Sequence, residues 1–228
     1  MSEAARTTIL ARLAAALGRD PASERRRKEE IAARLAVPTP NLIPARAQVS
    51  GEERIELFLR MARAVQTDVE RLAHLSDVAT ATTRFLRFHN LPQRLVAVPD
   101  PLLDRAGFDR QPLMRLRRGT ANVEDAVGLT IAEAGVAETG TLVLMSSPLR
   151  PTLVAFLPET LIVVLPIEDV VGAYEEAWQR IRARGGPSRS VNFITGPSRT
   201  GDIGQQITLG AHGPKRLLVL LVERLDRT

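Results

Sequence analysis

Residues 195–202 read Thr-Gly-Pro-Ser-Arg-Thr-Gly-Asp and follow an apolar segment. A glycine permits an unusual backbone angle or a close backbone approach, and the proline that follows stiffens the turn. Hydroxyl groups and a forked guanidinium then supply donors suited to a carboxylate or a phosphate. The segment therefore predicts an anion-binding turn. Its candidate binding residues are Gly196, Pro197, Ser198, Arg199, Thr200 and Asp202.

We expect a helix to begin near Asp202, because its free N–H groups would then face the same anion. A tight turn is the structural alternative, with Ser198 as the helix cap and Arg199 in solvent. The residues favour these two interpretations equally. The absence of Gly-Lys-Ser/Thr excludes a Walker sequence.

A second stretch, residues 133–141, places Glu133 and Glu138 in a loop of small residues ahead of an apolar strand. A carboxylate there could act as a base, a nucleophile or a hydroxyl acceptor. The alternative, which composition favours slightly, is a bulged hairpin whose glutamate binds its own backbone. Glu138 is the candidate catalytic residue. The candidate binding residues are Glu138, Thr139, Gly140 and Thr141.

His212 lies between glycines in the loop 210–214, before the last apolar segment. It could donate to a ligand or shuttle a proton, although such a histidine is more often exposed or bonded to the backbone. His74 and His89 share no ligand spacing with it, so the sequence predicts no metal site. His212 and Gly213 join the candidate binding residues.

The elements that position these stretches alternate between apolar strands and amphipathic helices. This alternation predicts an α/β fold with a mainly parallel sheet and helices on both faces. Ligands of such sheets bind beyond the carboxyl ends of the strands. Strands are expected at 94–98, 114–117, 128–132, 141–145, 161–165, 191–195 and 217–222.

Helix signals lie between the expected strands. Ser50 and Glu53 have the spacing of a capping box, and the helix behind them is expected over 51–74. A shorter helix is expected at 82–89, and the clearest one at 168–184. Asp100, ahead of a proline, is expected to cap a helical turn.

The N-terminal part is expected to form helices apart from the main domain. Asp20 stands before a proline, which is typical of a helix start. Three prolines then break the chain, so we place a helical arm and linker at 1–45 and the α/β domain at 46–228. The thin apolar stripe of the arm indicates either packing on a partner or on a second copy, or a loosely held helix. The breaking prolines are Pro38, Pro40 and Pro44.

The 228-residue chain contains no cysteine and has a net charge of +5. Disulfides, thiolate zinc sites and cysteine-ligated iron–sulfur clusters are therefore excluded within it. Scattered charges and an aromatic content of 4% argue against nucleic-acid binding. There is no secretory leader and no apolar run of about 20 residues, so we expect a soluble, cytoplasmic protein.

At the three chemical stretches the sequence resembles the lactate-utilisation protein C family, whose core is the LUD domain. The resemblance covers roughly residues 50–225. Its motifs are Ala-Glu-Thr-Gly-Thr at 137–141, Gly-Pro-Ser-Arg-Thr at 196–200 with Asp-Ile at 202–203, and His-Gly-Pro at 212–214.

The resemblance implies the α/β fold shared with sugar-phosphate isomerases and coenzyme A transferases. It implies a role in bacterial growth on L-lactate, oxidised to pyruvate, alongside two iron–sulfur partner proteins. This chain would bind a small carboxylate or phosphate and would hold no cofactor itself. The alternatives are a stand-alone isomerase or an acyl or coenzyme A transferase that uses Glu138, and a non-catalytic interaction or scaffold module.

Two positions depart from the family pattern. Leu161 stands where a histidine is frequent, and Gly204 stands where a glutamate is usual. Both missing groups are polar and belong near the presumed site, which indicates a variant ligand or weakened chemistry. Arg150, in a loop after the strand at 141–145, remains as a second cation and completes the set of candidate binding residues.

Overall fold

In the computed structural model, which describes residues 2–18, 20–38, 41–201 and 207–225, the chain divides into two compact units, 1–42 and 43–228. The larger unit is built on a six-stranded sheet, and all its neighbouring strands run parallel. In spatial order the strands are β1 (Asp68–His74), β12 (Arg216–Arg224), β7 (Thr160–Pro166), β4 (Val127–Ile131), β2 (Arg94–Ala97) and β3 (Arg115–Arg118).

Both faces of this sheet are covered, and β7 is buried along its whole length for that reason. On one face, α4 (Val78–Phe88) and the turn η3 (Pro101–Arg105) pack on the strands. On the other face, α3 (Gly51–Ala64) packs together with a second sheet. The predicted α/β class, with a mainly parallel sheet and helices on both faces, is confirmed.

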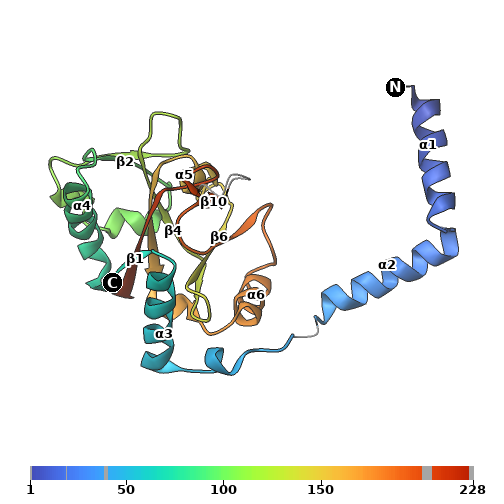
Figure 1. The fold of residues 1–228 in the computed structure, drawn as a ribbon, viewed down its shortest axis with the longest axis horizontal. Coiled ribbons are helices and arrows are strands. Elements are labelled where there is room, and N and C mark those ends of the chain that lie inside the picture. The colour runs from blue at the N-terminus through green and yellow to red at the C-terminus, as the bar shows by residue number, and fades with distance from the viewer. Residues whose placement is uncertain (1, 19, 39–40, 202–206, 226–228) are drawn as a thin grey trace. The chain divides into compact units, whose positions relative to one another are not determined.

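The second sheet has four strands in the order β8-β5-β6-β9. β5 is parallel to β8, whereas β6 is antiparallel to both β5 and β9. The outer face of this sheet is covered by α6 (Tyr174–Ala183). Figure 1 shows the layers in order, from α4 at the left to α6 at the right. The strands are β8 (Val170–Val171), β5 (Ala134–Val136), β6 (Thr141–Met145) and β9 (Val191–Ile194).

The predicted helix over 51–74 is wrong in its second half. α3 ends at Ala64, and Gln66 then adopts a left-handed φ of 63°, which redirects the chain. Val69 and Leu72 fit the helical period of α3, yet they lie in β1, whose backbone pairs with β12. Because Val69 and Leu72 are three residues apart, they face opposite sides of β1, with Leu72 in the core on the α4 side and Val69 against the core on the α3 side.

The predicted helix over 168–184 begins later than expected. Residues 167–169 form the turn η5 (Ile167–Asp169), and β8 follows before α6 begins at Tyr174. The predicted capping box is also wrong, since Ser50 makes no side-chain cap hydrogen bond. Asp100, in contrast, caps η3 as predicted and accepts the N–H of Leu102 at 3.0 Å.

The remaining elements of the larger unit are short. They lie mainly in the connections around the two sheets. They are η1 (Ala45–Ala47), η2 (Leu75–Asp77), η4 (Phe108–Arg110), α5 (Leu153–Phe156), β10 (Arg199–Gly201) and β11 (Ile207–Leu209).

The smaller unit consists of α1 (Glu3–Ala16) and α2 (Pro21–Ala36). These are the N-terminal helices that the sequence predicts. Asp20 caps α2 and accepts the N–H groups of Ala22 and Ser23, both at 2.9 Å. No residue of α1 is buried. Its apolar side chains are about half exposed, namely Ile9, Leu10 and Leu13.

Neither these helices nor any other helix within the described ranges combines the length and the apolar character needed to cross a membrane.

Candidate functional site

A cleft of about 460 Å³ opens at the carboxyl ends of β4 and β7. This is the edge at which parallel sheets with covered faces bind their ligands. Arginine and carboxylate side chains line it, over a few apolar ones. The lining residues are Leu102, Ile131, Ala132, Glu133, Arg150, Pro166, Glu168, Asp169, Arg180, Arg184 and Leu225.

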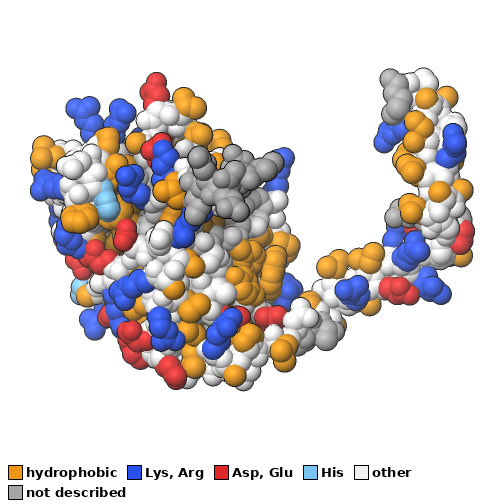
Figure 2. Space-filling view, viewed as in Figure 1, with side chains coloured by type: hydrophobic (Ala, Val, Ile, Leu, Met, Phe, Trp, Pro, Cys, Tyr) orange, Lys and Arg blue, Asp and Glu red, His pale blue; other side chains and the backbone are white. Residues whose placement is uncertain are grey.

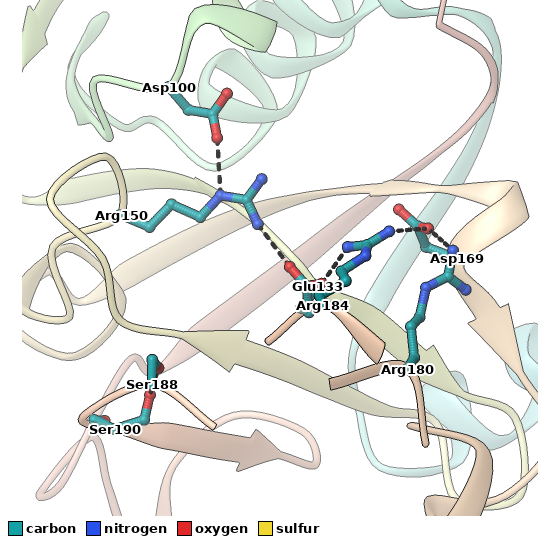
Figure 3. Close-up of polar contacts among 8 residues, drawn as sticks. All are labelled: Asp100, Glu133, Arg150, Asp169, Arg180, Arg184, Ser188 and Ser190. Atoms are coloured by element: carbon teal, nitrogen blue, oxygen red, sulfur yellow. Dashed lines mark hydrogen bonds and ion pairs between the residues drawn. The ribbon is translucent and has the colours of Figure 1, made fainter. Parts of the chain in front are cut away.

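Alternating charges run along this cleft in one connected chain, which Figure 3 shows. Nε of Arg150 donates to Asp100 at 2.8 Å, and its Nη1 donates to Glu133 at 3.2 Å. Glu133 also pairs with Arg184, whose other Nη lies 3.7 Å from Asp169. Arg180 pairs with Asp169 and ends the chain. We call these six residues the charge chain: Asp100, Arg150, Glu133, Arg184, Asp169 and Arg180.

The fold explains why the acids of the charge chain gather here. Asp100 follows the end of β2, and Glu133 follows β4 where the chain leaves the central sheet for the second one. Asp169 closes η5, directly after β7. Because carboxyl ends of parallel strands meet at one edge of a sheet, three side chains far apart in sequence become neighbours.

The arginines arrive from the second sheet and its helix. Arg180 and Arg184 are four residues apart, so the last turn of α6 presents both on one side. Arg150 is held by a tight turn in which Ser147 and Arg150 exchange backbone hydrogen bonds of 3.0 and 3.2 Å. The guanidinium of Arg184 is the most accessible of the three, with 49% of its side chain exposed against 26% for Arg180 and 23% for Arg150.

Asp169 has an unusual carboxyl group. Its side chain is only 12% exposed, and burial raises its pKa above the ordinary value, although Arg180 and Arg184 oppose this effect and the nearby Glu168 and Glu133 add to it. A carboxyl group with a raised pKa in a cleft is a typical feature of a functional site.

Three serines are hydrogen-bonded to one another where β6 ends and β9 begins. Ser146 and Ser190 are joined through backbone and hydroxyl groups at 2.9 and 3.0 Å, and the hydroxyl of Ser188 donates to the carbonyl of Ser190 at 2.9 Å. Figure 3 shows Ser188 and Ser190 away from the charge chain. These contacts fix the β6–β9 end that carries the Arg150 turn.

The predicted anion-binding turn lies elsewhere, near the amino ends of the central strands. The N–H of Ser198 donates to the carbonyl of Pro214, just before β12. The chain then forms an antiparallel pair of short strands, β10 and β11. The predicted helix start near Asp202 lies outside the described residues, and residues 207–209 beyond it form a strand. Asp202 itself, like Gly204, lies outside the described residues.

Side chains of the predicted turn form hydrogen bonds with the backbone of adjacent segments. Gly196 has a φ of +75°, and a Cβ there would lie 2.4 Å from the carbonyl oxygen of Val65. Arg199 donates to the same carbonyl at 3.0 Å, and the hydroxyl of Ser198 accepts the N–H of His212 at 3.2 Å. The close approach that Gly196 permits is thus to the end of α3. These contacts hold the turn against neighbouring segments, and the ligand roles of these residues stay predictions.

The His212 loop, residues 210–214, lies against the predicted turn. The backbone N–H of His212 donates to the hydroxyl of Ser198, and the His212 side chain is exposed. Gly213 lies beside Ser198, since a Cβ added at Gly213 would be 3.6 Å from the Cβ of that serine. Pro197 is half-buried, and Thr200 is described only by its backbone, within β10.

The Glu138 loop is a hairpin tip between β5 and β6. Glu138 is buried, and its carboxylate accepts from Arg46 at 3.2 Å rather than from its own backbone. Gly140 has a φ of +67° and packs against α3, where a Cβ would lie 2.3 Å from the nitrogen of Ala62. Glu138 is thus held in a buried ion pair, and its catalytic role stays a prediction.

A cluster of hydroxyl groups links this hairpin to the predicted turn. The hydroxyl of Thr141 lies 2.7 Å from that of Thr139, 2.9 Å from that of Tyr174 and 2.6 Å from that of Thr195. The Glu138 hairpin tip, the predicted turn and the His212 loop therefore lie on neighbouring segments. Arg150 is apart from them, in the cleft.

Sequence reasoning missed most of the cleft. It named Arg150 as a ligand residue and pointed out Glu133, but it predicted Asp100 only as a helix cap and gave no role to Asp169, Arg180 or Arg184. The sequence did contain the necessary information. Glu133 and Asp169 each follow a predicted strand, and the carboxyl ends of parallel strands meet at one edge of the sheet. Because the helix was expected to begin at residue 168, Asp169 was assigned to that helix and not to the turn that follows β7.

Two further sequence features can be placed. Leu161 is fully buried in β7 and packs in the core on the α3 face, so it faces no ligand space. Within the described part of the chain, no group of three or more His, Asp or Glu side chains is arranged to hold a metal ion.

The surface outside the cleft is mixed in charge. Figure 2 shows Lys and Arg side chains interspersed with Asp and Glu over the visible face of the larger unit. The cleft differs from this surface because its charges are partly buried and connected to each other.

Comparison with known proteins decides the family. Residues 110–222 match the LUD domain. Over 194 residues the chain is 32% identical to lactate utilization protein C of Exiguobacterium sp., a match that covers 77% of this chain and 80% of that protein. The chain belongs to the lactate utilization protein C family. The LUD match contains every member of the charge chain except Asp100.

Other family members match over a shorter stretch. The identity is 37% over 113 residues with the protein of Bacillus subtilis and 34% over 109 residues with that of Anoxybacillus flavithermus. In these matches the chain spans about half the length of the relative, 47% and 49% respectively.

A solved structure supports the fold. The crystal structure of a DUF162 family protein from Deinococcus radiodurans superposes with a TM-score of 0.60 at 20% identity. The superposition covers 76% of this chain and 99% of that one. This likeness extends over the α/β fold, whereas the likeness to coenzyme A transferases stays a prediction.

Proposed function

We propose that this chain takes part in lactate utilisation and that it binds a small carboxylate, of the size of L-lactate or pyruvate, in the cleft at the carboxyl ends of β4 and β7. The family supplies the metabolic context, through relatives named lactate utilization protein C. The observation that carries the proposal is the convergence of Arg150, Arg180 and Arg184 on this edge of the sheet.

The cleft has complementary groups for both ends of a 2-hydroxy acid. A guanidinium can bind a carboxylate through two parallel N–H donors, and half of the Arg184 side chain is open to solvent. The neighbouring carboxylates of Glu133 and Asp169 can accept a hydrogen bond from a ligand hydroxyl. Leu102 and Leu225 add apolar surface for a methyl group.

Calorimetric titration with L-lactate and pyruvate tests this proposal, with coenzyme A and a sugar phosphate as competing ligand classes. We expect Arg184→Gln to weaken carboxylate binding at least tenfold, about 1.4 kcal/mol, because a charge-assisted pair is lost. Arg199→Gln is the matched comparison from the predicted turn, and we expect it to bind like the wild type. Loss of binding in Arg199→Gln with retention in Arg184→Gln would move the site to that turn.

We further propose that the chain acts with iron–sulfur partner proteins. Oxidation of L-lactate to pyruvate releases two electrons, and this chain has no cysteine with which to ligate a cluster that could take them. The family resemblance points to such partners. Co-purification of the tagged chain with a cysteine-rich protein that absorbs visible light supports this proposal, and isolation of the chain alone from lactate-grown cells contradicts it.

A second copy of the chain is the partner that we propose for the N-terminal helices. Ile31 and Leu35 are one helical turn apart on α2 and are 54% and 72% exposed, and α1 leaves its apolar side chains similarly open. We expect deletion of residues 1–42 to lower the oligomer mass in light scattering. An unchanged mass would contradict this role.

A further inference from the structure

We propose that a ligand carboxylate enters the cleft by taking the place of Asp169 on the guanidiniums of Arg180 and Arg184, and that Asp169 takes up one proton as it is displaced. This inference rests on the proposed function, since it describes how the cleft accommodates a small carboxylate. It concerns proton transfer from solvent only, and no covalent bond to the ligand is made or broken.

The contacts of Asp169 make it the member of the charge chain that can be exchanged. Both of its arginine contacts go to a single carboxylate oxygen, Oδ1. The contact with Arg184 is 3.7 Å long, which exceeds a hydrogen bond. The bidentate face of the Arg184 guanidinium is therefore not satisfied by Asp169, and a ligand with two free oxygens can satisfy it better.

The other two acids of the charge chain are held more firmly. Glu133 uses one oxygen for Arg150 and the other for Arg184. Asp100 uses one oxygen for the N–H of Leu102 and the other for Arg150. Displacing either acid would break two bonds, one of them to Arg150, which lies between the two acids in Figure 3.

The charge of the cleft requires compensation when an anion enters. Within the charge chain, three guanidiniums, on Arg150, Arg180 and Arg184, pair with three carboxylates, on Asp100, Glu133 and Asp169. A monocarboxylate that takes over two of these guanidiniums would leave the Asp169 carboxylate without its partners in a partly buried space, where like charges repel strongly. A proton on Asp169 removes that uncompensated charge.

Within the charge chain, the surroundings of Asp169 favour uptake of that proton. The groups that face it are Arg180 and Arg184 from α6, Glu168 from its own turn, and Glu133 from the end of β4. Burial raises the pKa of Asp169 even with both arginines in place. When a ligand carboxylate takes over the arginines, Asp169 loses their stabilising charge and keeps the burial, so its pKa rises further.

Binding linked to uptake of one proton has a defined pH dependence. Above the pKa of Asp169 in the free protein, the dissociation constant increases up to tenfold for each unit of pH. The ligands themselves, L-lactate and pyruvate, stay ionised from pH 5 to pH 8, so they contribute no slope of their own in that range.

The experiment is calorimetric titration of the full chain with pyruvate and with L-lactate, at several pH values between 5 and 8 and in two buffers of different protonation enthalpy. We expect uptake of about one proton per ligand in the wild type above the pKa of Asp169. In Asp169→Asn we expect uptake to fall to zero, and the dissociation constant to become independent of pH and at least tenfold lower at pH 7.

Asp125→Asn is the matched control, because Asp125 is also a partly buried carboxylate, 17% exposed, paired with Arg117 outside the cleft. We expect it to behave like the wild type. Carboxylate binding by the wild type without proton uptake would overturn this inference and leave the proposed function standing. Absence of binding at every pH would overturn both. The wild-type proton count decides the question even if Asp169→Asn does not fold.

Discussion

Replacement of Gly140 by alanine is expected to lower the free energy of unfolding by at least about 3 kcal/mol. The added Cβ would lie 2.3 Å from the backbone nitrogen of Ala62 and 2.5 Å from its Cα. Neither atom can rotate away, so α3 would have to move off the second sheet and lose part of its packing in the core. The φ of +67° at Gly140 adds a cost of about 1 kcal/mol for any residue with a Cβ.

Gly51→Ala separates the clash from the backbone strain. Gly51 has a φ of +56°, close to that of Gly140, but no atom lies within 4 Å of its Cβ position. We expect a loss of only about 1 kcal/mol there. Equilibrium unfolding in denaturant gives both values. Equal losses in the two variants would show that the contact between the hairpin tip and α3 is not as close as described.

Replacement of Glu133 by glutamine is expected to cost about 2 to 3 kcal/mol of stability. The Glu133 side chain is 10% exposed, and it pairs with two arginines at once. Removing one member of a buried charge group leaves its partners uncompensated, which costs about 3 to 5 kcal/mol when burial is complete. The value expected here is smaller, because half of the Arg184 side chain is in solvent, which screens its charge.

Glu52→Gln provides the comparison for that loss. Glu52 also pairs with an arginine, Arg71, but its side chain is 61% exposed, so we expect a much smaller loss of stability than in Glu133→Gln. Denaturant unfolding at neutral pH measures both variants. A Glu133→Gln protein as stable as Glu52→Gln would mean that the charge chain does not hold the second sheet to the central one.

The strands of the central sheet could be predicted best from the sequence. β7 and β12 are continuous apolar runs, and such runs are expected where a parallel sheet is covered on both faces. The Asp100 and Asp20 caps could also be predicted, since a cap depends on a few adjacent residues.

The errors arose where one apolar pattern fits two structures. Val69 and Leu72 are three residues apart, which suits one face of a helix and also suits a strand whose two faces are both covered. The left-handed turn at Gln66 that decides between them leaves no mark in residue type. The early start assigned to α6 has the same origin, because β8 is only two residues long and owes its pairing to β5.

The glycine-rich motifs illustrate a different limit. Gly140 and Gly196 were interpreted as places where a backbone can approach a ligand, and both do permit a close approach. In the structure the approaching group is α3, at Ala62 and Val65. A motif can show that space is needed beside a glycine, but the identity of what fills it comes from tertiary packing.

The measurement that most directly tests binding in the cleft is a crystal structure of the protein with pyruvate. We expect a pyruvate carboxylate between Arg180 and Arg184, with Asp169 displaced from both guanidiniums and with Arg150 still bonded to Asp100 and Glu133. Pyruvate bound instead at the Ser198 and His212 loops, with the charge chain unchanged, would contradict it.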